Sequence, residues 1–265
     1  MGFSDYPFPS YGWDYQGIDF AGIPITQSLA DQMYNDGIRF VGRYLFSRQY
    51  PSGKGITAQE AQYYINAGLK IFLYYEVDTT DAFSGYNGGY QNGQTAFNLA
   101  VQVGVPQGTQ IFCCCDTGVT NAQAQGVVMQ YLAGFADAIQ GYTPGIYGGA
   151  NVMDACYSQF QNYSRVQAGA WGLQEFDPIN IRQWLIGYNN RALNDGKIRI
   201  SNITIDRDGY AKWNGHNVDI LSANSLVNMW GDSSPTPPTP PTPPTPPVPP
   251  VEDTSMPIWF YLKKF

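Results

Sequence analysis

Charge is scarce in this sequence of 265 residues. Only 13% of the side chains are Asp, Glu, Lys or Arg, and 21 acidic residues outnumber 14 basic ones, for a net charge of -7. An ordinary soluble domain carries about 25% charged residues. An acidic chain of this kind disfavours binding to phosphate backbones and to anionic membrane surfaces, so we expect no nucleic-acid partner.

Long hydrophobic runs are also missing. No stretch approaches the ~20 apolar residues of a membrane-spanning helix, so we predict no membrane span. The first ten residues, MGFSDYPFPS, have neither the basic region nor the hydrophobic core of a secretion signal. The sequence as written therefore predicts no Sec export.

Histidine and cysteine are too few, or too badly spaced, for several kinds of site. His216 is the only histidine and lies in the polar run KWNGHN, where we expect a surface side chain rather than part of a catalytic triad. Cys113, Cys114 and Cys115 are consecutive and Cys156 stands alone, which does not match the separated ligand pairs of a zinc site. We predict small buried residues on a core strand, with no metal and no cofactor.

Proline is abundant in one place only. Eleven of the 19 prolines lie between Pro235 and Pro250, in a three-residue repeat that favours a stiff polyproline II rod. We predict four parts: an N-terminal arm (1–10), a globular domain (11–232), a proline-rich linker (233–250) and a docking peptide (251–265). The alternative for the last two is an unstructured tail.

Short apolar runs alternate with helical patterns along the globular part, as in a parallel sheet with crossover helices. The predicted strands are 16–20, 38–44, 70–76, 110–116, 144–149, 166–173, 181–187 and 202–206. The predicted helices are 28–35, one that starts with the capping box Thr57–Glu60 and stops at Gly68, 95–103 and 121–139. Eight strand units indicate an α/β fold, a (β/α)8 barrel of the TIM type with irregular last units. An open doubly wound sheet is the alternative, but no GxGxxG or GxxxxGK[ST] motif supports a nucleotide site.

Acidic residues recur where the predicted strands end, which in such a barrel is the catalytic mouth. They are Asp19, Glu76, Asp116, Glu175 and Asp206. Paired carboxyl groups are the machinery of glycoside hydrolysis. We predict Glu76 as the acid, because it ends the apolar strand KIFLYYE, with Asp116 or Asp19 as its partner. Structural carboxylates that bind loop amides are the alternative.

Further side chains are candidates for sugar binding at the same mouth. Aromatic faces stack on sugar rings, and polar groups read hydroxyls. The predicted substrate-binding residues are Tyr44, Tyr147, Trp184, Glu175 and Asp206. Aromatic residues on strands also fill barrel interiors, so we expect many tyrosines and tryptophans to belong to the core.

Several segments, taken in order, resemble a known family. They are GIDF (17–20), FVGRYL (40–45), AGLKIFLYYE (67–76), IFCCCD (111–116), GIYGG (145–149), RQW (182–184) and ITID (203–206). Between about residues 11 and 230 the chain resembles the glycoside-hydrolase-like domain of unknown function found in actinobacterial secreted proteins and phage tail proteins. That domain is distantly similar to family 25 lysozymes.

This resemblance implies a barrel with an acidic mouth that includes Asp19, Asp116 and Asp206. In the lysozymes the fourth strand ends in Asp-x-Glu, whose glutamate is the catalytic acid, whereas here Gly118 occupies that position. Either Glu76 takes over the role of the acid, or the domain binds cell-wall glycan without cutting it.

The resemblance and the missing export signal together favour a phage virion, since lysis releases virion proteins without export. We expect a tail-associated protein, present in many copies, that binds cell-wall polysaccharide and a second virion protein through its C-terminal peptide. The other locations considered are extracellular and cell-surface. The alternative to an enzyme is a non-catalytic carbohydrate-binding or structural virion protein with a degenerate site.

Overall fold

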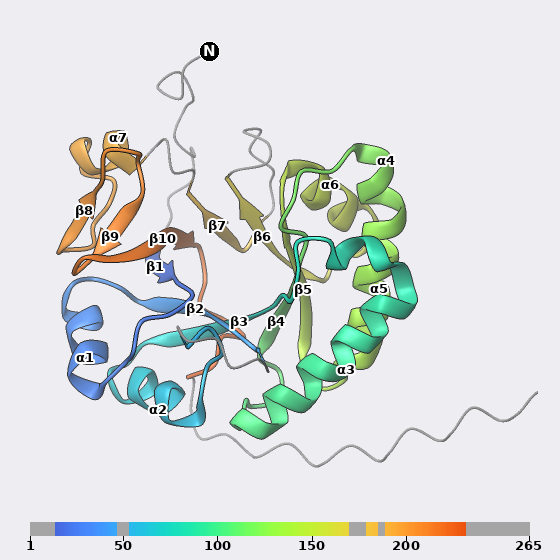
Figure 1. The fold of residues 1–265 in the computed structure, drawn as a ribbon, viewed down its shortest axis with the longest axis horizontal. Helices are drawn as coiled ribbons and strands as arrows, with labels where there is room; N and C mark the ends of the chain where they lie inside the picture. The colour runs from blue at the N-terminus through green and yellow to red at the C-terminus, as the bar shows by residue number, and fades with distance from the viewer. Residues whose placement is uncertain (1–13, 47–52, 170–178, 185–188, 232–265) are drawn as a thin grey trace, which may run out of the picture.

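A computed structural model describes residues 14–46, 53–169, 179–184 and 189–231. Eight of its strands close into a barrel in the order β1-β2-β3-β4-β5-β6-β7-β10, and β10 pairs back to β1 (Figure 1). These strands are β1 (Tyr15–Asp19), β2 (Phe40–Tyr44), β3 (Lys70–Tyr75), β4 (Gln110–Cys114), β5 (Thr143–Gly148), β6 (Ser164–Ala168), β7 (Ile181–Gln183) and β10 (His216–Ala223). The closure confirms the predicted TIM-type barrel and excludes the open doubly wound sheet.

The last barrel strand differs from the prediction. Strands β1 to β7 run parallel, but β10 is antiparallel to both of its neighbours, β1 and β7. The predicted eighth strand, 202–206, corresponds to β8 (Ile203–Ile205). Among the described strands it pairs only with β9 (Ala211–Trp213), in a hairpin that extends from β10. The prediction that 202–206 closes the barrel is therefore wrong. The chain first forms the β8–β9 hairpin, and the later strand β10 then pairs with β1 and β7 to close the barrel.

Helices cover the outside of the barrel between the strands (Figure 1). They are α1 (Gln27–Asn35), α2 (Ala58–Asn66), the 3-10 turn η2 (Asp81–Ser84), α3 (Gly85–Val103), α4 (Asn121–Gln123), the π-helical turn η3 (Ala124–Val128), α5 (Met129–Ala138), α6 (Ala150–Gln159) and α7 (Asn189–Asn194). Three of the four predicted helices match closely, and the fourth, 95–103, starts ten residues earlier at Gly85. The short α7 agrees with the expected irregularity of the last units.

Sequence signals explain where these helices begin. Thr57 accepts a hydrogen bond from the backbone N–H of Glu60 (3.1 Å), as the capping-box pattern predicts. The Glu60 carboxylate, however, binds Arg43 on strand β2. At the start of α4, Thr120 and Gln123 bind each other's backbone N–H groups in a complete capping box.

Two apolar layers hold the barrel together. In the inner layer, every second side chain of a strand points into the barrel, as Phe40, Phe72 and Phe112 do. The outer layer lies between the strands and the surrounding helices. All four cysteines are buried, as predicted, and they are free. The prediction of a core strand is wrong for Cys156, which lies on helix α6. Cys113 and Cys115 belong to the outer layer, whereas Cys114 between them points inward.

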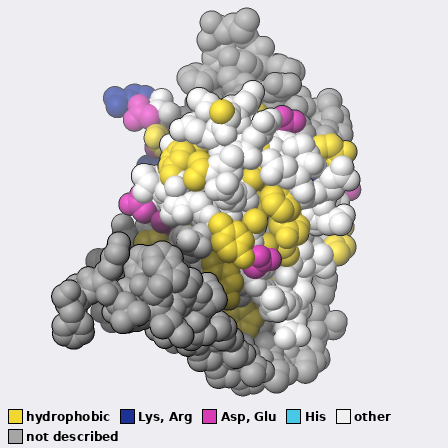
Figure 2. All heavy atoms as spheres, turned by 90° about the vertical axis from the view of Figure 1, so that its right-hand side faces the viewer, with side chains coloured by type: hydrophobic (Ala, Val, Ile, Leu, Met, Phe, Trp, Pro, Cys, Tyr) yellow, Lys and Arg dark blue, Asp and Glu magenta, His cyan; other side chains and the backbone are white. Residues whose placement is uncertain are grey.

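The face formed by the helices is poor in charge. Figure 2 shows that face with few charged side chains and with hydrophobic side chains scattered among uncharged polar ones. Large side chains that stay partly exposed on these elements include Phe83, Tyr86 and Tyr157. The low content of charged residues in the sequence is therefore matched by a surface on which uncharged polar groups and tyrosines predominate. In the described ranges no helix is long and apolar enough to cross a bilayer.

Candidate functional site

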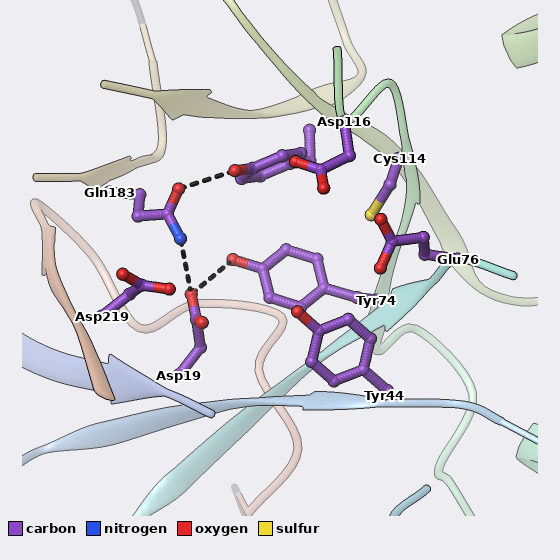
Figure 3. A pocket seen from close by; sticks show the side chains of 9 residues that line it. Asp19, Tyr44, Tyr74, Glu76, Cys114, Asp116, Gln183 and Asp219 are labelled. Carbon is purple, nitrogen blue, oxygen red and sulfur yellow. Dashed lines mark hydrogen bonds between the residues drawn. The ribbon is translucent and has the colours of Figure 1, made fainter. Parts of the chain in front are cut away.

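A polar pocket opens at the carboxyl-terminal ends of the parallel strands (Figure 3). Its volume is about 110 Å³. Its walls come from seven of the eight barrel strands and the residues that follow them: Asp19, Tyr44, Tyr74, Glu76, Cys114, Asp116, Tyr147, Gln183 and Asp219. Four carboxyl groups thus meet at the mouth of an otherwise apolar barrel.

The alternation of strand residues places these groups. Tyr74 and Glu76 lie two positions apart along β3 and its end, and Cys114 and Asp116 have the same spacing on the next strand, so each pair faces the interior. On the first strand, Asp19 finds room because residue 42 is glycine. A Cβ there would lie 2.8 Å from the Cβ of Asp19.

One side of the pocket is a hydrogen-bonded network around Asp19. The Tyr147 hydroxyl donates to Gln183 Oε1 (2.6 Å), and Gln183 Nε2 donates to Asp19 Oδ2 (3.4 Å). The Tyr74 hydroxyl donates to the same oxygen of Asp19 (3.3 Å). Figure 3 shows Asp219 beside Asp19 on this side of the pocket, while Glu76, Cys114 and Asp116 lie on the other.

Burial raises the pKa values of both carboxyl groups on the Asp19 side of the pocket. Burial raises the pKa of Asp19 well above its ordinary value, and the neighbouring charge of Asp219 raises it further. The pKa of Asp219 is raised to about 6 by burial, against the opposing effect of hydrogen bonds with Asp19 and Gln183. The two aspartates therefore titrate as a pair, and the proton on each depends on the charge of the other.

The other side of the pocket combines a carboxyl pair with a lysine. Burial raises the pKa of Asp116 to about 7, and the charge of Glu76 and a hydrogen bond with it act in the same direction. Lys54 Nζ lies 3.0 Å from Glu76 Oε2 and also lies over the Tyr44 ring, 4.6 Å from its centroid. Asp116 therefore carries a proton below about pH 7, beside a glutamate whose charge is balanced by Lys54.

Most of the predicted site residues meet in this pocket. Asp19, Glu76, Asp116, Tyr44 and Tyr147 all line it. Glu175 lies outside the described residues. His216, which we expected at the surface, is exposed at the start of β10.

Two predicted substrate-binding residues are elsewhere. Asp206 lies in the turn between β8 and β9, where its side chain accepts from the backbone N–H groups of Asp208 and Tyr210. Trp184 belongs to the outer apolar layer and donates from Nε1 to Ser222 Oγ (2.7 Å). The strand alternation explains this, because Gln183 faces the pocket and the next residue must face away.

Sequence reasoning missed Asp219 and Gln183 as site residues. Gln183 is adjacent to the predicted Trp184, so the correct strand was found with the wrong face. Asp219 was missed because 216–223 was not predicted as a strand, although Val218 and Ile220 alternate with it as buried residues. Over the described part of the chain, no group of three or more His, Cys, Asp or Glu side chains is arranged to hold a metal ion.

Comparison with known proteins gives a family and a fold. A family model described as "Rv2525c-like, glycoside hydrolase-like domain" matches residues 31–220. The chain is similar in structure to the Tat-secreted protein Rv2525c of Mycobacterium tuberculosis, solved in complex with L-tartrate, with a TM-score of 0.63 and 20% identity over 82% of this chain and 98% of that one.

Two further solved structures are similar to the chain. An uncharacterized B. stearothermophilus protein has a TM-score of 0.54 and 17% identity, over 82% of this chain and 100% of that one. A glycosyl hydrolase 25 of Streptococcus pneumoniae has a TM-score of 0.49 and 12% identity, over 81% and 88% of the two chains. No curated protein sequence matches the chain.

Proposed function

Because the chain belongs to the Rv2525c-like, glycoside hydrolase-like domain family, we propose that its barrel mouth binds a sugar unit of bacterial cell-wall glycan and hydrolyses the glycosidic bond. The observation that carries this proposal is the pocket with two carboxyl pairs, Asp19 with Asp219 and Glu76 with Asp116. Glycoside hydrolysis requires one protonated and one ionised carboxyl group on either side of the bond.

The two pairs suit these roles. Asp116, with a pKa of about 7, is the group that holds a proton for the leaving oxygen, and Glu76 keeps it there. This exchanges the roles that the sequence predicts for Glu76 and Asp116. Across the pocket, the Asp19–Asp219 pair supplies the carboxylate that activates water or stabilises the positive charge of the sugar. Tyr44 and Tyr147 provide aromatic faces and hydroxyls for the sugar ring.

The experiment is release of reducing ends from purified bacterial cell walls. We expect release by the wild type, and a loss of at least about 100-fold in Asp116→Asn and in Glu76→Gln, since general acid catalysis contributes roughly 10²–10⁴-fold. Asp137→Asn is the matched control, because that carboxylate binds the exposed Tyr86 hydroxyl far from the pocket. Equal release by all variants would refute the assignment.

The size of the pocket favours a second candidate, a binding module without hydrolysis. At about 110 Å³ the pocket is far smaller than ordinary ligand sites of roughly 300–1,000 Å³, so it admits only part of one sugar unit. Protein that sediments with purified cell walls but releases no reducing ends from them would establish this function. Loss of that sedimentation in Asp19→Asn would place the binding at the mouth.

The place of action follows from the substrate. We propose that the chain works outside the bacterial cytoplasm, where wall glycan is found, and the similar Rv2525c protein is described as Tat-secreted. We further propose a tail-associated virion protein held on its partner by residues 235–265, which lie outside the described residues. This proposal is supported by the proline repeat and aromatic end of the sequence. If a chain without residues 235–265 still enters phage particles, the tether is excluded.

A further inference from the structure

A buried arginine lies directly behind the acidic mouth. Arg43 is on β2 between two residues that face the barrel interior, Gly42 and Tyr44, so its own side chain points outward toward α2. It is 0% exposed. A buried guanidinium requires partners for its N–H groups, and those partners show what it holds.

Each part of the guanidinium has a distinct partner. Nε donates to Glu60 Oε1 at 2.6 Å, and this oxygen also accepts from the Tyr64 hydroxyl at 2.8 Å. Nη1 donates to the carbonyl of Phe20 (2.5 Å), and Nη2 donates to the carbonyl of Gly53 (2.9 Å). The guanidinium also lies over the Phe20 ring, 4.6 Å from its centroid.

Both carbonyls belong to residues next to charged groups of the pocket. Phe20 directly follows Asp19, and Gly53 directly precedes Lys54, the lysine that pairs with Glu76. The anchor is α2 itself, because Glu60 is in its first turn. The arginine therefore joins two loops from adjacent strand ends to one rigid helix.

We infer that Arg43 is a positioning residue of the barrel mouth. By binding the carbonyl of Gly53 it holds Lys54 next to Glu76, and by binding the carbonyl of Phe20 it holds Asp19 at the pocket wall. Its consequence for hydrolysis rests on the proposed function. Its effect on the charges of the pocket does not, because the arrangement exists without substrate. A lysine at this position keeps the charge but cannot bind two carbonyls and a carboxylate in one plane.

Asp116 reports the position of Lys54. The groups that shift the pKa of Asp116 are Glu76, Tyr147 and Lys54. The charge of Asp116 in turn raises the pKa values of Asp19, Cys114 and Cys115. Lys54 lowers the pKa of Asp116, so displacement of Lys54 must raise it. The titration of Asp116 can be followed by carboxyl carbon NMR and assigned with Asp116→Asn, without any substrate.

The test is a double-mutant cycle on the folded full chain. We expect Arg43→Lys and Lys54→Met each to move the Asp116 midpoint above the wild-type value of about 7, and the double variant to move it no further than Lys54→Met alone. The matched control is Arg39→Lys, since Arg39 lies just before the opposite end of β2, bound to the carbonyls of Tyr34 and Ile38. It should leave the midpoint unchanged.

Two results would overturn the inference. One is a folded Arg43→Lys variant with the wild-type Asp116 midpoint, which would leave Arg43 a purely structural role. The other is full additivity of the two substitutions, which would mean that Arg43 does not act through Lys54. If Arg43→Lys does not fold, Glu60→Gln weakens the same anchor at nearly constant size and must raise the midpoint in the same direction. If wall hydrolysis is absent but the cycle behaves as expected, only the proposed function fails.

Discussion

At the scale of single residues, four carboxyl groups of a protein that is poor in charge lie together in one pocket. Burial raises the pKa of Asp116 to about 7 and that of Asp219 to about 6, and for Asp116 the neighbouring Glu76 adds to the rise. Sequence reasoning found Asp19, Glu76 and Asp116 because each follows an apolar run at a strand end. It assigned the proton of the acid to Glu76, whereas burial and Glu76 raise the pKa of Asp116. The pKa values in the pocket also depend on Lys54 and Asp219, which come from other parts of the chain.

A raised carboxyl pKa has a defined effect on stability. The pKa of Asp116 rises from 3.8 to about 7 on folding. Between these values the folded state keeps a proton that the unfolded chain has lost, so the free energy of unfolding must fall as the pH rises through this window. In Asp116→Asn this contribution is absent.

We therefore expect the free energy of unfolding to drop more between about pH 4.5 and about 7.5 in the wild type than in Asp116→Asn. Urea unfolding at both pH values measures it. Asp19 and Asp219 contribute the same direction of change to both proteins. Equal losses in the two proteins would show that Asp116 titrates normally.

At the scale of elements, helix α3 departs most from its sequence. Its first half, GYNGGYQNG, is rich in glycine, a poor helix former, and only the second half was predicted as helical. Two of these glycines, Gly89 and Gly93, allow close packing against α5. A Cβ on residue 89 would lie 2.0 Å from the carbonyl oxygen of Tyr131, and one on residue 134 would lie 2.0 Å from that of Tyr86. Local propensity could not reveal a contact between two helices about 40 residues apart.

Gly89→Ala should therefore destabilise the protein, although alanine is the better helix former. Overpacking of this kind costs about 1–3 kcal/mol, because backbone atoms must move. Gly126→Ala is the control, since a Cβ there meets nothing within 4 Å. It should be neutral or stabilising by up to ~1 kcal/mol. Thermal unfolding compares the two, and equal stability would contradict the close helix packing.

At the scale of the whole molecule, the residues that follow β10 cover the end of the barrel opposite the pocket, where strands β3 and β4 begin. Trp230 and Ile71 exchange backbone hydrogen bonds (2.7 and 2.8 Å), and the backbone N–H of Gln110 donates to Asn228 (2.7 Å). Met229 packs into the inner apolar layer. The sequence predicted eight units and an acidic mouth, but not this closure, because β10 and the residues after it pair with strands distant in the sequence.

Compared with a chain that ends at Gly231, one that ends at Ala223 should lose several kcal/mol of stability. The second loses buried apolar side chains and leaves the N–H groups of Ile71 and Gln110 without their backbone partners. Denaturant unfolding of the two truncated chains decides the point. If the two are equally stable, residues 224–231 do not close the barrel.

We propose that the acidic mouth cleaves cell-wall glycan with a proton held on Asp116. The most direct measurement is the pH dependence of kcat/KM for reducing-end release from purified walls, because this profile reports groups of the free enzyme. We predict that kcat/KM falls as the pH rises, with a midpoint near the Asp116 value of about 7, and that Asp116→Asn is inactive throughout. Folded protein that releases no reducing ends at any pH, yet sediments with the walls, would contradict the claim and leave a glycan-binding barrel.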